Sequence, residues 1–148
     1  MKLDALNWKI LKCLQENARQ SNAEIGRQVG ITSPAVSERI RKMEDAGVIK
    51  GYFAKLSYTE TGHQLKAIIT LRAFMGKLKP FLEKVKTYDE VINCYRITGD
   101  ENIVMEVVLK DQKHLEKFID QLIIYGESKT QIVLSSVVKQ KEVKPVID

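Results

Sequence analysis

The polar side chains with the most informative spacing lie between residues 33 and 45. Val36, Ile40 and Met43 recur there at helical spacing and predict a stripe that faces a core. Because successive helical residues are rotated by about 100°, polar groups fall on the opposite face. They are Ser33, Ser37 and Arg41, with Glu38 and Lys42 beside them. Arginine makes paired hydrogen bonds to guanine and a serine hydroxyl donates or accepts, so this face has the chemistry of major-groove reading.

Further basic residues flank this face. Arg39 lies toward its edge, and Lys50 lies just past the helix, where each is expected to reach a phosphate. Arg27, on the preceding helix, is less well placed. The alternative is a solvated helix face on which Glu38 pairs with Arg41 or Lys42.

The residues before this segment predict two more helices. Asp4 is suited to cap the first, and Ser21 with Glu24 has the spacing of a capping box at the start of the second. Gly30 fits the left-handed residue that ends the second helix. A supporting helix followed by two short helices and a turn containing glycine is the helix-turn-helix layout.

Beyond Gly51 the apolar period changes from helical spacing to two. Residues 52–58 alternate and predict a strand, and residues 60–62 break it. We therefore expect a DNA-binding domain with its hinge strand over residues 1–62 and a second domain over residues 63–148. A break of this length is typical of a hinge.

The second domain shows two similar halves, which predict strands and helices in the order β-α-β-β-α-β. The strands are expected at 66–74, 91–98, 103–109 and 130–139, and the helices around 78–85 and 115–122. This order is the ferredoxin-like motif, and the fold class is α+β. Apolar residues occur at both parities of the last strand, so we expect both of its faces to be buried. Dimerisation through the open face of the sheet would provide that burial.

Composition narrows the function classes. Lys and Arg total 24 against 19 Asp and Glu in 148 residues, a net charge of +5 that permits nucleic-acid binding. The two cysteines lie far apart and neither histidine has partners at metal-ligand spacing, so neither a disulfide framework nor a metal site is expected. No nucleophile and base, phosphate-binding glycine loop or membrane-spanning run is present, so we expect no enzyme, cofactor or membrane partner, and a cytoplasmic location.

Three stretches make the chain resemble the Lrp/AsnC family, the leucine-responsive and asparagine-responsive transcription regulators of prokaryotes. They are LDALNWKILKCLQENAR from Leu3, ITSPAVSERIRKMEDAGVIKGY from Ile31 and YRITGDENIVMEV from Tyr95. The resemblance implies a winged helix-turn-helix that binds double-stranded DNA, followed by a dimerisation and effector domain. It further implies that dimers assemble, for which we expect an octamer, and that free amino acids bind in clefts between dimers.

The resemblance also implies where the effector binds. It points to the turn Gly99, Asp100, Glu101 and Asn102, and to Thr130, Gln131 and Ser135 on the last strand. A tight turn offers backbone N–H groups to a ligand carboxylate, and nearby oxygens hold its ammonium group. Asn102 stands where the family usually has aspartate, and Glu101 replaces a common aromatic. The alternative is an ordinary turn in a regulator that has no small-molecule effector.

A second alternative is a protein that binds single-stranded RNA through its ferredoxin-like sheet. Such sheets present aromatic and basic residues together on one face. Tyr95 is the one aromatic in the two central predicted strands, so the sequence favours the DNA-binding regulator.

Overall fold

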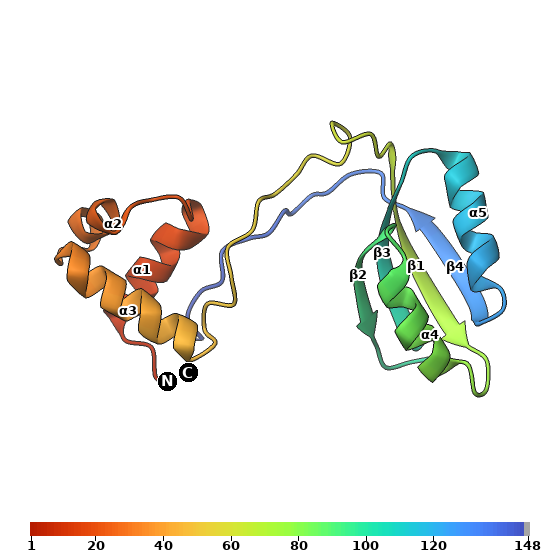
Figure 1. The fold of residues 1–148 in the computed structure, drawn as a ribbon, viewed down its shortest axis with the longest axis horizontal. Coiled ribbons are helices and arrows are strands. Elements are labelled where there is room, and N and C mark those ends of the chain that lie inside the picture. The colour runs from red at the N-terminus through yellow and green to blue at the C-terminus, as the bar shows by residue number, and fades with distance from the viewer. Residues whose placement is uncertain (147–148) are drawn as a thin grey trace. The chain divides into compact units, whose positions relative to one another are not determined.

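The computed structural model describes residues 1–146. The chain forms two compact units (Figure 1): residues 1–54 together with the tail that begins at Val138, and Lys55–Val137. The change of unit at residue 55 falls a few residues before the boundary predicted at 62. Sequence patterning gave no sign that the tail packs with the first unit. No helix among the described residues is long and apolar enough to cross a bilayer.

The first unit contains three helices, α1 (Ala5–Glu16), α2 (Asn22–Val29) and α3 (Ser33–Asp45). Both predicted caps are present. An Asp4 carboxylate oxygen accepts a hydrogen bond from Asn7 N at 2.7 Å, and Ser21 and Glu24 form the reciprocal capping box. Gly30 has the left-handed φ of 80° that the end of α2 requires.

A small apolar core holds these helices together. Ile10 and Cys13 of α1, Ile25 of α2, and Val36 and Met43 of α3 are buried against one another. The spacing of the apolar residues thus correctly predicts which face of α3 points inward. With the α2–α3 turn, this core fixes the opposite face of α3 toward solvent.

The strand predicted at residues 52–58 is wrong. Residues 51–57 form no strand, and their side chains are exposed. A strand is stable only when its backbone groups pair with a neighbour, and no other described segment of the chain pairs with these residues. Alternation of apolar residues predicts an extended segment with one apolar face. It does not show whether a neighbouring strand is present to pair with that segment.

The second unit is a four-stranded antiparallel sheet with helices on one face (Figure 1). Its strands are β1 (Leu65–Ala73), β2 (Val91–Arg96), β3 (Ile103–Leu109) and β4 (Gly126–Ile132), in the order β2-β3-β1-β4. Helices α4 (Leu78–Lys84), with the single 3₁₀ turn η1 (Val85–Thr87), and α5 (Gln112–Leu122) connect them. This is the predicted ferredoxin-like arrangement.

The core of the second unit lies between the helices and one face of the sheet. Ile69 of β1 and Met105 of β3 pair across the two central strands and are fully buried. Phe81 of α4 and Phe118 of α5 cover them from the helical layer. Every second residue of β1 and β3 therefore faces the helices, and the residues between them face the open side of the sheet.

The predicted position of the last strand is wrong by several residues. β4 runs over Gly126–Ile132, whereas the sequence pattern predicted 130–139. Of the apolar residues beyond Ile132 that suggested burial on both faces, Val133 is half-buried, and Leu134, Val137 and Val138 are exposed in the single chain. Register explains the shift, because β4 pairs with β1 from Gly126 opposite Ala73 to Ile132 opposite Ala67, and the ladder ends there.

Candidate nucleic-acid interface and ligand cleft

Helix α3 presents the predicted polar face to solvent. Ser37, Glu38, Arg41 and Lys42 are exposed and Ser33 is half-buried at the first turn. Thr32 occupies the N-cap position but its side chain makes no capping hydrogen bond, and Pro34 follows in the first turn. The first backbone N–H groups of α3 therefore lack an intrahelical acceptor and a side-chain cap, which suits the approach of an anionic group.

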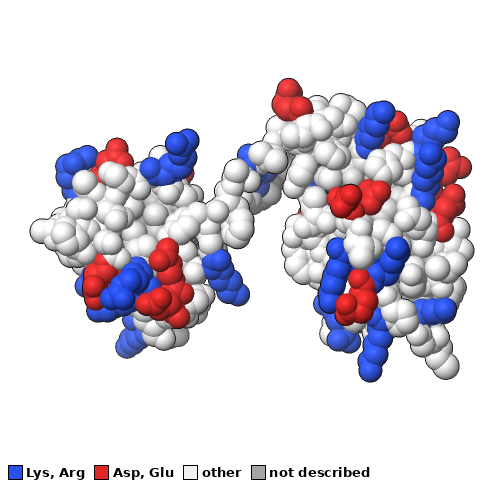
Figure 2. All heavy atoms as spheres, in the orientation of Figure 1, with Lys and Arg blue, Asp and Glu red and all other residues white. Residues whose placement is uncertain are grey.

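The charged residues of this face pair with one another. Glu38 lies 3.2 Å from Lys42 Nζ and 3.6 Å from Arg41 Nη2. The hydrogen bond from Lys42, followed by the charges of both cations, lowers the pKa of Glu38. Figure 2 shows basic and acidic side chains intermixed on the surface of the N-terminal unit. Glu38 therefore neutralises part of the positive charge on the α3 face in the free protein.

Arg39 connects two helices instead of standing free. Its Nη1 donates to Asp4 Oδ2 and to Asn7 Oδ1, both at 2.8 Å. Asn7 is 3% exposed, so this is a partly buried link between the start of α1 and the middle of α3. Backbone hydrogen bonding and Arg39 together lower the pKa of Asp4. The structure thus gives Arg39 a positioning role that its place at the edge of the polar face did not indicate.

The segment after α3 is held by a contact that the sequence did not predict. Tyr52 donates its hydroxyl hydrogen to Glu44 Oε1 at 2.9 Å. Partial desolvation of the hydroxyl where it meets Glu44, followed by the hydrogen bond to Glu44 itself, raises the pKa of Tyr52 to about 12, so the phenol stays protonated and able to donate. Lys50 lies between these two residues and is exposed. This contact restrains the backbone that carries Lys50.

The tail of the chain also belongs to this unit. The Gln15 side-chain amide of α1 accepts from Val143 N at 2.8 Å and donates to Val143 O at 3.2 Å. Lys141 and Lys144 lie two residues before and one residue after Val143. Sequence reasoning missed this contact because no periodicity joins residues so far apart.

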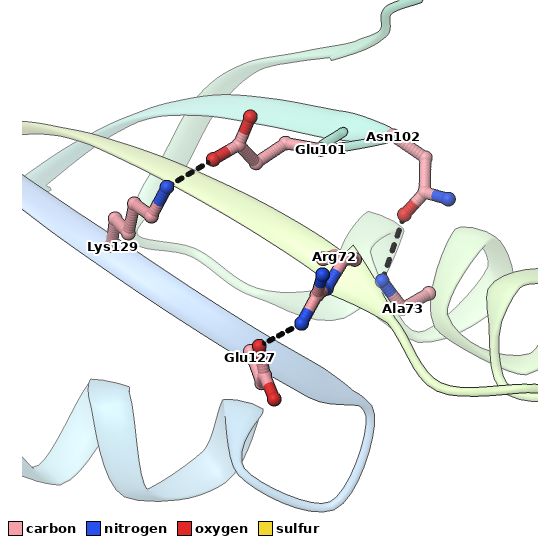
Figure 3. Close-up of polar contacts among 6 residues, drawn as sticks. All are labelled: Arg72, Ala73, Glu101, Asn102, Glu127 and Lys129. Carbon is pink, nitrogen blue, oxygen red and sulfur yellow. Dashed lines mark hydrogen bonds and ion pairs between the residues drawn. The ribbon is translucent and has the colours of Figure 1, made fainter. Parts of the chain in front are cut away.

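In the second unit, a cleft of about 340 Å³ opens beside the turn before β3. Its lining residues come from β1, that turn and β4: Arg72, Asp100, Glu101, Glu127, Ser128 and Lys129. Two ion pairs join its lining residues (Figure 3), one between Lys129 Nζ and Glu101 Oε1 at 2.6 Å and one between Arg72 and Glu127. The hydrogen bond between Lys129 and Glu101 lowers the pKa of the glutamate and raises that of the lysine.

Asn102 has a structural contact at this turn (Figure 3). Its Oδ1 accepts a hydrogen bond from Ala73 N at 2.7 Å, and its backbone N–H donates to Leu71 O at 3.1 Å. It therefore ties the turn to the end of β1. Gly99 takes a φ of 112°, which favours glycine, within the same turn.

The structure brings together only part of the predicted effector set. Asp100 and Glu101 line the cleft, whereas Gly99, Asn102, Thr130, Gln131 and Ser135 are not among its lining residues. Thr130 pairs with Ile69 and Gln131 with Ile68, so these neighbours point to opposite faces of β4, and Ser135 lies beyond the strand. Sequence reasoning missed Arg72, Glu127, Ser128 and Lys129. The ferredoxin-like strand order, which places β4 beside β1, was the signal that could have found them.

A helix-turn-helix unit joined to a separate α+β unit is the arrangement of one class of protein, the DNA-binding transcriptional regulators. Two family models match the chain: "winged helix-turn-helix DNA-binding" over residues 3–50 and "Lrp/AsnC ligand binding domain" over residues 66–143. The chain belongs to the Lrp/AsnC family of transcriptional regulators, and it is not an enzyme.

Similar proteins come from archaea and bacteria. The transcriptional regulator Ptr1 of Methanocaldococcus jannaschii is 36% identical, with 82% of each chain covered. YezC of Bacillus subtilis, an HTH-type transcriptional regulator, is also 36% identical, over 90% of this chain and 95% of its own. Among solved structures, a Neisseria meningitidis transcriptional regulator in complex with L-Met superposes with a TM-score of 0.91 at 26% identity and 97% coverage of both chains.

Proposed function

We propose that this regulator reads a specific DNA sequence with the exposed face of α3. The observation that carries the proposal is the orientation of that helix, whose apolar stripe is buried while Ser37, Arg41 and Lys42 face solvent. Ser33, Ser37 and Arg41 contact base edges, with Glu38 beside them, and Lys42 and Lys50 contact phosphates. Arg39 holds α3 against α1 through Asp4 and Asn7.

Binding assays on matched variants test this assignment. Arg41→Ala is expected to weaken binding to the selected operator by about tenfold or more, with a smaller effect on random duplex, because it removes a contact to a base. Lys50→Ala should weaken both equally and reduce the salt dependence. Lys9→Ala, an exposed cation on α1, is the control. Equal losses on operator and random duplex for Arg41→Ala would contradict base reading, and preference for single-stranded RNA would contradict the proposal as a whole.

The same proposal includes a dimer formed through the open face of the sheet. Ile68 of β1 and Val104 of β3 lie on the face opposite the helices and are only half-buried. Beyond β4, Leu134 and Val137 are 96% and 94% exposed, an arrangement that a second copy would cover. Two copies would present two α3 helices to successive major grooves, and such dimers assemble to an octamer. Sedimentation of the purified protein measures this, and a monomer at micromolar concentration would contradict it.

We infer that a free amino acid modulates the regulator from the cleft beside Asp100 and Glu101, and that the protein works in the cytoplasm. The ligand-binding family model and the L-Met complex of the Neisseria relative support an amino-acid effector. Effector binding would bias the contacts between dimers and so the number of DNA sites held. Sedimentation with a panel of amino acids tests the inference, and an unchanged assembly together with absent binding across the panel would contradict it.

A further inference from the structure

The wall of the cleft is unusually rich in charge. Arg72 and Lys129 supply two cations, and Asp100, Glu101 and Glu127 supply three carboxylates, with Ser128 completing the lining. Among the described residues, no apolar residue lines the cleft. A ligand with an apolar side chain would gain little from entering, because its favourable transfer depends on contact with apolar surface.

One of the three carboxylates that line the cleft takes part in no ion pair within residues 1–146. Lys129 is paired with Glu101 and Arg72 with Glu127, whereas Asp100 forms no ion pair within 4.0 Å with any described residue. The five charged side chains therefore carry a formal net charge of −1, and the unmatched group lies in the turn. A ligand with a net charge of +1 matches this balance.

The geometry points to an amino acid that carries a second cationic group, such as L-lysine, L-ornithine or L-arginine. We propose that the cleft selects this class over apolar amino acids, an inference that rests on the proposed effector function. The ligand carboxylate bonds to Arg72 or Lys129, which are exposed enough to turn toward it, and its two cationic groups bond to the glutamates and to Asp100. Each existing ion pair thus already holds one group of the required sign in place.

The turn is built to keep Asp100 in position. Asn102 bonds to Ala73 N and Leu71 O, which fixes the turn against β1 two residues after Asp100. From β4, the Lys129 side chain donates a hydrogen bond to Glu101, the residue after Asp100. Asp100 lies between Gly99, with its glycine-type backbone, and these two anchored residues. The unpaired carboxylate therefore does not depend on a long mobile loop for its place.

Three ligands of nearly equal length separate the contribution of the terminal ammonium group to binding from that of the carboxylate. Calorimetric titration of the full-length protein uses L-lysine, L-norleucine, which has a hydrogen atom in place of the terminal ammonium group, and cadaverine, which lacks the carboxylate. We expect L-lysine to bind at least about tenfold more tightly than either analogue, since each lost charged hydrogen bond costs about that factor. Glutamate, with the opposite net charge, should not bind.

A substitution of Asp100 tests whether this residue of the turn recognises the ligand. Asp100→Asn is expected to weaken L-lysine binding by about tenfold and to reduce the preference over norleucine to about threefold or less. Asp120→Asn, which removes an exposed carboxylate from α5 outside the cleft, is the matched control and should bind L-lysine as the unmodified chain does.

The outcomes are distinct. Norleucine binding as tightly as lysine would overturn the charged class while leaving an amino-acid effector in place. Cadaverine binding as tightly as lysine would overturn recognition of an amino acid in favour of a simple amine. If no member of a full amino-acid panel binds, the effector function itself fails. An equal loss in Asp100→Asn and Asp120→Asn would overturn the assignment of Asp100.

Discussion

At the scale of single residues, the proposed DNA-reading face of α3 includes a carboxylate, Glu38, whose charge would oppose DNA binding. Glu38 forms ion pairs with both Arg41 and Lys42 in the free protein. To contact DNA, these cations would have to break or weaken their ion pairs with Glu38. Its carboxylate would also lie near phosphates. Such a residue lowers affinity for every sequence while the base contacts discriminate among sequences.

We therefore predict that Glu38→Gln raises affinity for random duplex DNA by about fivefold at 0.1 M salt, with a smaller gain at higher salt because screening weakens the removed charge. Fluorescence anisotropy with labelled duplexes at several salt concentrations measures this. Glu16→Gln, on α1, is the control for a change of one charge. Unchanged or weaker random binding in Glu38→Gln would mean that Glu38 contributes no repulsion at the interface.

Asp4 provides a pH-dependent contact within the same unit. Its pKa is lowered in the folded state by the Asn7 backbone N–H and by Arg39, so the stabilisation is fully present above the ordinary carboxyl pKa of about 4. It is lost as pH falls through the lower pKa of the folded state.

Asp4→Asn keeps a capping oxygen but removes the charge that binds Arg39. We expect a slightly lower melting temperature than the unmodified chain at pH 7, with the difference disappearing once the pH falls below the lowered pKa of Asp4 in the folded state, where Asp4 is protonated in both states. Thermal unfolding across this pH range measures the difference. A gap that stays constant at all pH values would show that the variant acts through packing instead of charge.

At the scale of elements, the turn between α2 and α3 depends on a glycine that the sequence pattern did not single out. Gly26 is buried in α2, and a Cβ atom there would lie 2.5 Å from the carbonyl oxygen of Ile31. Ile31 lies in the turn that leads into α3. Helix α2 therefore approaches its own turn too closely for any side chain.

Gly26→Ala is expected to destabilise the first unit by about 1–3 kcal/mol, the usual cost of inserting atoms into a packed site. DNA affinity should fall because α3 loses its fixed orientation. Ala23→Gly, at an exposed position of the same helix, is the comparison for helix propensity. Chemical denaturation followed by Trp8 fluorescence measures the change, and an unaltered midpoint for Gly26→Ala would refute the close-approach argument.

The elements also show why sequence patterning succeeded in some places and failed in others. Helix caps such as Asp4 and Ser21 act within a few residues, so local spacing located α1 and α2. The segment 52–58 and the start of β4 depend on what lies beside them in space. The first part of β4 is polar and does not favour strand formation by itself, as its residues Glu127, Ser128 and Lys129 show. These residues form a strand because they pair with β1. The β1 and β4 residues of the cleft escaped prediction for the same reason, since Arg72 meets Glu127 only because β4 pairs with β1.

At the scale of the whole molecule, the polypeptide passes from the first unit to the second and then back again. The segment after α3 makes the first passage, and the residues after β4 lead to the tail that packs with the first unit. The return is fixed by the two hydrogen bonds between Gln15 and the backbone of Val143. The strand that lines the cleft, β4, is thus continuous with a segment docked on the DNA-binding helices.

We predict that Gln15→Ala releases this tail while leaving the helices folded. Both hydrogen bonds are exposed and each contributes on the order of 1 kcal/mol at most, so the midpoint of unfolding should change little. Amide exchange at Val143 should become at least several-fold faster, because its N–H loses the Gln15 oxygen that accepts it. Gln15→Glu keeps an acceptor for that N–H and should retain part of the protection, while Lys12→Ala, one turn earlier on α1, should retain all of it. Equal exchange in Gln15→Ala and the unmodified chain would show that the tail is held by packing alone, and the side-chain clamp would then have no role in joining β4 to α1.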